Sequence, residues 1–169
     1  MGGYSLPFVE TNRLKLVTFT VQMMEALSIS KSELEKIVPY NIAEGYPMEV
    51  YRQFFAYKIE RFQRFPDENE WEGIIINKKD NTIIGDMGFK GGPNEEGIID
   101  IGYSIVPNYQ GKGYATEMGK AMVEWGLSQP NVKKIVATCD PDNLSSQRVL
   151  KKIGFSLTNT TDKKLYWSY

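Results

Sequence analysis

The stretch from Ile98 to Leu127 constrains the fold most, because its pattern changes from strand to loop to helix within a short length of chain. Residues 98–106 are rich in β-prone types, and the loop that follows contains Gly111 and Gly113. Apolar side chains then recur at helical spacing, at Met118, Ala121, Met122 and Trp125, before Pro130 blocks continuation. A strand that leads through a short loop into a helix is typical of α/β domains. The free N–H groups at the start of such a helix can bind an anion.

Periodicity and turn signals predict the remaining elements. Strands are expected at residues 13–19, 71–76, 82–89, 98–106 and 133–139, with two more around a turn at 161–163. Helices are expected after caps at Thr20 and Ser32, over residues 47–65, over 113–127, and over 144–153 with a stop at Gly154. This order predicts an α/β (α+β) fold, with a mixed central sheet of about seven strands flanked by helices.

Size and composition limit the class of protein. With 169 residues and 41% hydrophobic content, the sequence is expected to form one domain over residues 1–169. The net charge of -1, without a basic cluster, disfavours a nucleic-acid partner. No apolar run approaches the roughly 20 residues that span a bilayer, so no membrane partner is expected. The N-terminus lacks the pattern of a secretory leader and Cys139 is the single cysteine, so we expect a cytoplasmic location and no intrachain disulfide.

The absence of histidine restricts the chemistry further. It removes Ser-His-Asp and Cys-His nucleophilic machinery and most zinc sites, so no metal is expected. Cys139 ends the apolar run 135–139, where a thiol packs as a small hydrophobe more often than it reacts. Any catalysis therefore depends on carboxylates, hydroxyls, amines or backbone amides.

The segment from Gln110 to Ala115 is the candidate phosphate site. Gly111 and Gly113 lack a Cβ, so their backbone can approach a phosphate closely, and Ala115 keeps the first helical turn narrow. The segment lacks the Gly-Lys-Ser/Thr ending of a P-loop and the Gly-x-Gly-x-x-Gly of a dinucleotide site, so neither a kinase nor a dehydrogenase is supported. Taken alone, the glycines are equally compatible with a plain strand-to-helix turn. The surrounding sequence must decide between the two interpretations.

The surrounding sequence resembles the GNAT superfamily of acetyltransferases. Motif A of that family, Gln/Arg-x-x-Gly-x-Gly/Ala, is matched by Gln110, Gly113 and Ala115 directly after the strand-like run 101–107. Further segments resemble the branch typified by ribosomal-protein N-terminal (Rim-type) acetyltransferases, in order over nearly the whole chain: Glu10–Leu14, Ile84–Phe89, Asp100–Tyr103, Asn143–Ser146 and Lys152–Phe155. The resemblance implies a mostly antiparallel sheet whose fourth and fifth strands splay apart, with acetyl-CoA bound in the gap.

The resemblance also assigns cofactor-binding residues. It places the pantetheine arm against the backbone of Ser104, Ile105 and Val106, and it places the pyrophosphate beside Gln110 on the segment Gly111, Lys112, Gly113, Tyr114, Ala115 and Thr116. Asn143 and Ser146 match positions that contact the pantetheine or the acyl sulfur, and Lys152 matches one near the adenosine phosphates. From the residues alone, Asn143 is equally a helix cap and Lys152 equally a solvated surface charge.

The reaction that the resemblance implies is direct attack of a neutral primary amine on the acetyl thioester. Many members of the family carry a tyrosine seven residues after the asparagine, which protonates the leaving thiolate, but this sequence has Leu150 there. Ser146 is then the nearest hydroxyl for that role. Asp100 stands where related sequences carry glutamate and is the candidate base, although a solvent-facing or ion-paired carboxylate is an equal alternative.

The acceptor stays open at this point. A protein or peptide N-terminal α-amine is favoured as the acceptor. Its pKa is about 8, against about 10.4 for lysine, so it needs less help from the enzyme to become the neutral nucleophile at neutral pH. A small amine, such as a polyamine or an antibiotic, is the alternative acceptor, and a non-catalytic acyl-CoA-binding module is the alternative function. The loops at residues 29–47 and 90–97 are expected to decide the acceptor. Many members of the family dimerise, so a homodimer is an expected assembly.

Overall fold

The computed structural model describes residues 7–169. Its strands are β1 (Pro7–Glu10), β2 (Leu14–Thr18), β3 (Asn41–Ile42), β4 (Glu72–Asn77), β5 (Thr82–Phe89), β6 (Ile98–Ile105), β7 (Lys134–Cys139), β8 (Ser156–Thr160) and β9 (Leu165–Ser168). Its helices are α1 (Val21–Ile29), α2 (Lys31–Glu35), α3 (Glu49–Arg52), α4 (Phe55–Arg64), α5 (Tyr114–Leu127) and α6 (Leu144–Ile153), with 3₁₀ turns η1 (Pro66–Trp71) and η2 (Pro107–Tyr109).

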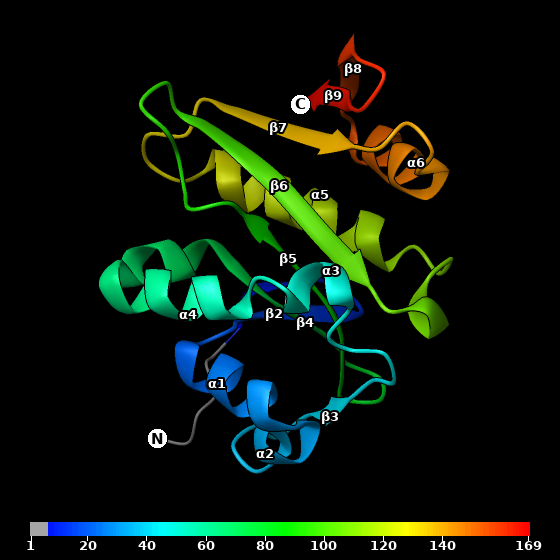
Figure 1. The fold of residues 1–169 in the computed structure, drawn as a ribbon. Helices are drawn as coiled ribbons and strands as arrows, with labels where there is room; N and C mark the ends of the chain where they lie inside the picture. The colour runs from blue at the N-terminus through cyan, green and yellow to red at the C-terminus, as the bar shows by residue number, and fades with distance from the viewer. Residues whose placement is uncertain (1–6) are drawn as a thin grey trace.

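The strands form one mixed sheet (Figure 1). They lie in the order β1-β2-β4-β5-β6-β7-β9-β8, and β3 pairs with β5 beside this path. The pairs β3 with β5 and β6 with β7 are parallel, and the other pairs are antiparallel. The mostly antiparallel α/β fold predicted from the sequence is therefore confirmed.

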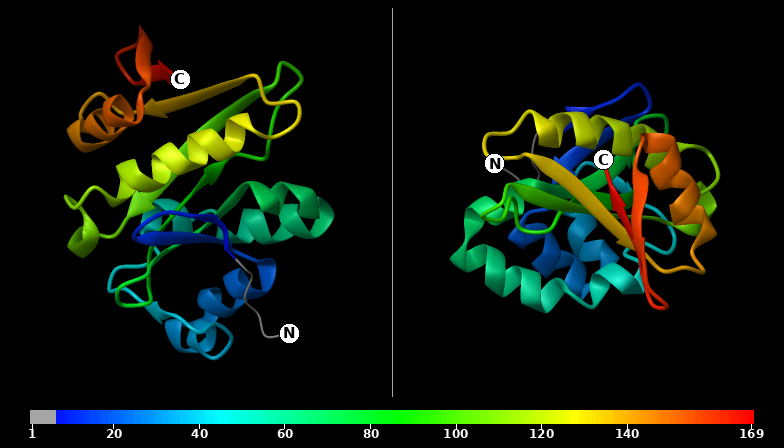
Figure 2. Two further views of the ribbon diagram at one scale, coloured as in Figure 1. Left: turned by 180° about the vertical axis from the view of Figure 1, so that it is seen from behind. Right: turned by 90° about the horizontal axis from the view of Figure 1, so that it is seen from above.

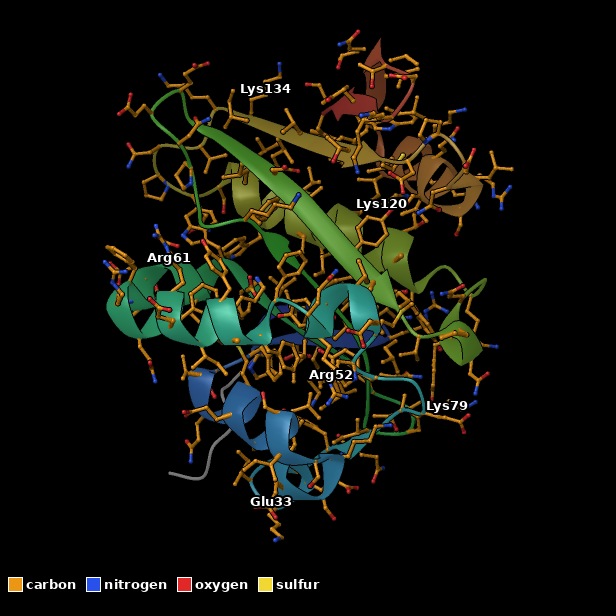
Figure 3. All side chains as sticks on the ribbon, viewed as in Figure 1. Glu33, Arg52, Arg61, Lys79, Lys120 and Lys134 are labelled. Carbon is orange, nitrogen blue, oxygen red and sulfur yellow. The ribbon has the colours of Figure 1, made fainter. Side chains whose placement is uncertain are left out.

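Helices cover both faces of the sheet (Figure 2). α5 lies on one face, and α1, α3 and α4 lie on the other. Every residue of β4 is buried, and in β5 only Gly88 is partly exposed. Because both faces are covered, these strands are continuous apolar runs such as 74–76 and do not alternate with polar residues. Charged residues such as Lys79, Lys120 and Lys134 are exposed around this core (Figure 3).

The strands β6 and β7 are joined at one end only. Residues 98–100 of β6 pair with residues 134–136 of β7. Beyond Asp100, β6 continues along β5 to Ile105, whereas β7 continues along β9. The two strands diverge toward α6, which Figure 1 shows, and this divergence is the splay predicted for the fourth and fifth strands.

Close packing places α5 beside this gap. A Cβ at Gly126 would come within 2.9 Å of Phe89 and 3.0 Å of Ile99, so the glycine lets the end of α5 approach the sheet. A Cβ at Gly119 would collide with the side chain of Ile153 on α6. The two small residues therefore fix α5 between the sheet and α6, with its N-terminus at the open end of the gap.

The structure corrects several expected boundaries. The sheet has nine strands in the described residues where about seven were expected, because β1 and β3 are too short for a visible alternation. The expected helix over 47–65 is two helices, α3 and α4, since Gln53 and Phe54 interrupt it. The cap of α2 is Ser30 and not Ser32, because the Ser30 hydroxyl accepts from Glu33 N at 3.1 Å. Cys139 is buried and unpaired, as expected.

Two further expectations concern the extent of the domain and the lack of a membrane partner. One domain over residues 1–169 stays a prediction, since residues 1–6 lie outside the described residues. Between residues 7 and 169, no helix has the length and apolar character required to cross a membrane.

Candidate active site

The loop before α5 takes the conformation that its glycines predict. Gly111 and Gly113 have φ values of +76° and +82°, a region that side chains with a Cβ rarely adopt. No heavy atom lies within 4 Å of a Cβ placed at Gly111, so this side of the loop is open. Gln110 Nε2 donates to Ile105 O at 2.7 Å and ties the loop to the end of β6.

The N-terminus of α5 presents backbone donors. The first intrahelical hydrogen bond runs from Glu117 N to Gly113 O at 2.9 Å. The N–H groups of Tyr114, Ala115 and Thr116 precede it, so they have no partner one turn back in the helix. These donors and the helix dipole together favour an anion at this position.

A contact with the N-terminal part of the chain holds this helix end. Arg13 Nε donates to Glu117 Oε1 at 2.6 Å, and Thr11 Oγ1 donates to Glu117 Oε2 at 2.6 Å. Arg13 Nη1 also donates to Lys112 O at 3.0 Å. Burial alone raises the pKa of Glu117, but the hydrogen bonds from Thr11 and Arg13 outweigh it and hold this pKa below its ordinary value. The glutamate is therefore ionised at neutral pH and anchors the loop through Arg13.

A cavity of about 480 Å³ extends from this helix end into the gap. Most of the residues assigned from the sequence line it: Ser104, Ile105, Gln110, Gly111, Gly113, Tyr114, Ala115, Thr116, Asn143, Ser146 and Lys152. A neighbouring cavity of about 550 Å³ lies on the other side of the helix end and shares Gly113, Thr116 and Lys152 with it. The fold thus brings β6, the loop and α6 together around one space.

Three assigned residues do not line this cavity. Val106 is buried, and its N–H donates to Ile84 O at 2.9 Å on β5. Lys112 is exposed on the loop. Asp100 lies in the paired part of β6, where its Oδ2 is 3.3 Å from Lys90 Nζ. Asp100 is thus ion-paired, which was the alternative to a catalytic role, and the catalytic role itself stays a prediction.

The sequence did not indicate several residues that line the same cavity: Met48, Val50, Tyr103, Tyr109, Ser145, Arg148 and Val149. Arg148 precedes Lys152 by one helical turn on α6. Residues at this spacing share a helix face, so the assignment of Lys152 could have indicated Arg148 as well. Met48 and Val50 come from the start of α3 and reach the cavity only through the tertiary fold. No local pattern could have located them.

Backbone groups of β6 alternate between β5 and the gap. Lys90 N donates to Asp100 O and Val106 N donates to Ile84 O, so residues 100, 102, 104 and 106 face β5. The N–H and C=O groups of Tyr103 and Ile105 consequently face the gap. Of the residues assigned to the pantetheine arm, only Ile105 has its backbone aimed there.

Two hydroxyls meet at the α6 side of the cavity. Ser146 Oγ and Tyr103 Oη are 3.1 Å apart, and either can donate to the other. Burial raises the pKa of Tyr103, although the hydrogen bond with Ser146 opposes the rise, so its phenol stays protonated at neutral pH. Asn143 Oδ1 accepts from Ser146 N at 3.0 Å, so Asn143 does cap α6 and also lines the cavity. Leu150, at the family's tyrosine position, is 1% exposed and belongs to the core.

The described part of the chain holds no group of three or more His, Cys, Asp or Glu residues that could bind a metal ion. The groups gathered at the cavity are backbone amides, hydroxyls and two basic side chains, Arg148 and Lys152. This set suits a phosphate-bearing ligand and acyl transfer.

Comparison with known proteins decides the family. The family described as Acetyltransferase (GNAT) domain matches residues 13–156. The chain is 33% identical over 162 residues to the uncharacterized N-acetyltransferase YjdG of Bacillus subtilis (strain 168), an alignment that covers 95% of this chain and 96% of the relative. This chain belongs to the GNAT acetyltransferase family.

Solved structures share the fold of this GNAT protein. The ribosomal-protein-S5-alanine acetyltransferase of Vibrio fischeri aligns with a TM-score of 0.66 and 16% identity, over 98% of this chain and 96% of that one. RimL, a ribosomal L7/L12 alpha-N-protein acetyltransferase in complex with coenzyme A, aligns with a TM-score of 0.64 and 16% identity, over 94% of each chain. At these identities the likeness concerns the fold. The protein is an acetyl-CoA-dependent N-acetyltransferase, as motif A predicted.

Proposed function

We propose that this GNAT acetyltransferase transfers the acetyl group to the N-terminal α-amine of a protein or peptide. The observation that carries the proposal is the continuity of the 480 Å³ cavity, which runs from the donors of α5 past Ser104 to Met48 and Val50 on α3. One end suits phosphates, the middle lies at the gap, and the other end has an apolar wall. This order matches a ligand that delivers an acyl group to an amine held against α3.

The phosphate end fits coenzyme A. The open loop at Gly111 admits a phosphate, and the N–H groups of residues 114–116 can donate to it. Arg148 and Lys152 line the same cavity, so they can neutralise the remaining charge. Bound there, acetyl-CoA supplies the acetyl thioester. Tyr103, through its N–H and C=O, and Ile105, through its N–H, would hold the pantetheine arm in the way a neighbouring strand would, while Ile105 O accepts from Gln110 Nε2.

The paired hydroxyls of Tyr103 and Ser146 replace the missing tyrosine at position 150. In their 3.1 Å contact one hydroxyl donates to the other, which leaves one hydroxyl hydrogen free to donate at the α6 side of the gap. A phenol that stays protonated at neutral pH can donate to a leaving sulfur. Ser146 keeps the role assigned to it from the sequence, and Tyr103 joins it.

The apolar wall favours a peptide acceptor over a small amine. Met48 and Val50 line the cavity, and Val50, Phe54 and Tyr57 are 57%, 49% and 64% exposed along α3 and α4. A peptide can place side chains on this surface beyond the reacting amine, whereas a polyamine has none to place there. The likeness to two ribosomal-protein acetyltransferases supports the same choice. A homodimer and a cytoplasmic location stay predictions.

An acceptor screen tests the proposal. The purified protein is incubated with acetyl-CoA and hexapeptides that begin with alanine or serine, and thiol release and peptide mass are followed. The same peptides with a formylated N-terminus and one internal lysine are the matched control, with spermidine and kanamycin as small amines. We expect acetylation of the free N-terminus only. Transfer to the small amines alone would favour the alternative acceptor, and coenzyme A binding without transfer to any amine would indicate a non-catalytic module.

A further inference from the structure

A cluster of buried and partly buried polar side chains lies over β4 and β5, on the face of the sheet that α3 and α4 cover. We call it the carboxylate cluster, and it comprises Asp86, Glu72, Lys58, Tyr51 and Tyr46. Asp86 is 6% exposed and Glu72 is 7% exposed. Buried carboxylates are rare unless they are paired or functional, so the burial of each one requires a physical explanation.

The two carboxylates of the cluster differ in their partners. Lys58 Nζ is 2.7 Å from Glu72 Oε2, and Tyr51 Oη donates to Glu72 Oε1 at 2.7 Å. Glu72 is thus paired with a cation and hydrogen-bonded on both oxygens. Asp86 instead accepts from Ser104 Oγ at 3.0 Å, and no lysine or arginine of residues 7–169 forms an ion pair with it. Pairing accounts for Glu72 and leaves Asp86 to be explained.

The surroundings of Asp86 allow it to change its charge near neutral pH. Burial, together with the negative charge of Glu72, raises the pKa of Asp86 to about 7, against the hydrogen bond from Ser104 and the positive charge of Lys58. The phenols of Tyr46 and Tyr51 face the same carboxylates, and burial raises the pKa of both, so they stay protonated. Asp86 is therefore the group of this cluster that can accept and release a proton.

Ser104 connects Asp86 to the cavity. It lines the cavity, and it is the cross-strand partner of Asp86 in the pairing of β5 with β6. Successive side chains of a strand point to opposite faces, so Tyr103 points toward α6 while Ser104 points toward the face covered by α3. The open gap beyond Asp100 joins these two faces. An amine on the α3 side would meet the Ser104 hydroxyl with Asp86 directly behind it.

We infer that Ser104 takes the proton from the attacking amine and passes its own proton to Asp86, so that Asp86 is a positioning residue that acts through Ser104. This inference rests on the proposed acetyl transfer. The amine nitrogen forms a bond to the acetyl carbon, and the electron pair of the carbon–sulfur bond leaves with the sulfur. One amine proton moves to Ser104 Oγ as the Ser104 proton moves to Asp86 Oδ2. Tyr103 or Ser146 donates its hydroxyl proton to the sulfur and regains one from solvent, and Asp86 returns its proton to solvent.

Asp100, the base expected from the sequence, has a different setting. It is four residues from Ser104 on the same strand, which corresponds to about 13 Å. Its carboxylate is paired with Lys90, and it does not line the cavity. The two aspartates can therefore be distinguished by experiment.

The test is the pH dependence of kcat at saturating acetyl-CoA, with the alanine-initiated hexapeptide as acceptor. For the wild type we expect kcat to rise through about pH 7 as Asp86 ionises. Asp86→Asn should lower kcat by on the order of 10²-fold and remove the rise near pH 7, leaving the rise near pH 8 that comes from the acceptor α-amine, with coenzyme A affinity unchanged by calorimetry. Ser104→Ala should do the same, and Ser104→Thr, which keeps the hydroxyl, should retain the rise. A purely structural role would change stability or affinity and leave the rise in place.

Glu72→Gln provides an independent check. Removing the negative charge beside Asp86 should move the rise in kcat to lower pH without abolishing it. Retention of the rise near pH 7 in Asp86→Asn, or its loss in Asp100→Asn instead, would overturn the inference while leaving the acetyl transfer intact. Absence of transfer by the wild type would overturn the proposed function and the relay with it.

A second measurement does not depend on any acceptor. In protein labelled with ¹³C at the aspartate carboxyls, the signal missing from Asp86→Asn identifies Asp86. We expect this signal to titrate near pH 7 in the wild type and at higher pH in Ser104→Ala, which loses the hydrogen bond that lowers the pKa of Asp86. Titration near pH 4, the ordinary range of an aspartate, would overturn the relay whatever the acceptor proves to be.

Discussion

Gly113 combines a left-handed backbone conformation with a position in the proposed phosphate site. Its φ of +82° directly precedes α5, and it lines both cavities. A valine there would be strained in the left-handed region and would place methyl groups where a phosphate must approach. We expect Gly113→Val to lower coenzyme A affinity by at least about tenfold in calorimetric titration, with the circular dichroism spectrum of a folded protein.

Gly91 offers the matched control for that substitution. Its φ of +76° imposes the same kind of strain, but it lies in the loop after β5 and does not line the cavity. Gly91→Val should therefore lose stability and keep its affinity for coenzyme A. Unchanged affinity in a folded Gly113→Val protein would remove the phosphate site from this loop.

Leu150 has a packing role where many relatives have a tyrosine. It is 1% exposed, so a larger side chain has no room without displacing its neighbours. We expect Leu150→Tyr to lower the free energy of unfolding by about 1 to 3 kcal/mol in urea denaturation. Leu157→Tyr, at a position that is 49% exposed, should change it little. Equal stability of both variants would show that position 150 faces open space.

The sequence was better suited to finding the proposed phosphate site than the proposed proton-transfer groups. Gly111, Gly113 and the start of α5 are neighbours in the chain, so local spacing was sufficient to find them. The proposed proton-transfer groups come from separate segments, at Tyr46, Asp86 and Ser104. The property that singles out Asp86 is its raised pKa, which results from burial, and burial cannot be read from the sequence. Asp100 was predicted as the base from its position in a motif, whereas in the structure its side chain is paired with Lys90.

At the scale of elements, α6 contributes the positive charge of the cavity. Arg148 and Lys152 lie one turn apart on the face that lines it, while Lys151 lies outside the lining. We expect the double variant Arg148→Ala/Lys152→Ala to bind coenzyme A about tenfold more weakly and with less dependence on salt. Lys151→Ala should bind normally. Equal loss in the control would mean that the net charge of the helix acts at a distance, without direct contact.

The elements that were predicted well are those whose pattern is complete within their own residues. β6 and α5 follow from β-prone and helical runs of eight and fourteen residues. The break between α3 and α4 does not, because it depends on where their side chains dock. Tyr51 donates to Glu72, and Phe55 packs against Phe19 with ring centroids 5.6 Å apart. The periodicity of residues 47–65 looks the same with or without the break.

At the scale of the whole molecule, the buried Asp86 predicts a stability that falls as the pH rises. The pKa of Asp86 is raised from 3.8 to about 7 on folding, so this carboxyl binds its proton more tightly in the folded state. Its stabilising effect is complete below about pH 4 and is lost as the pH rises through about 7, a change on the order of 4 kcal/mol. Urea denaturation between about pH 5 and pH 8 should show this decline in the wild type and a flatter profile in Asp86→Asn. Parallel profiles would mean that Asp86 is solvated.

The divergence of β6 from β7 also determines how the backbone exchanges hydrogen with water. In an uninterrupted sheet, the amide protons at the middle of a central strand are among the slowest to exchange. The amides of Tyr103 and Ile105 face the gap, so they should exchange in D₂O much faster than those of Ser104 and Val106, which face β5. Protection of alternate residues along one strand would then report directly on the ligand, because a pantetheine arm lying in the gap would slow exchange at the odd-numbered positions and leave the even-numbered ones unchanged.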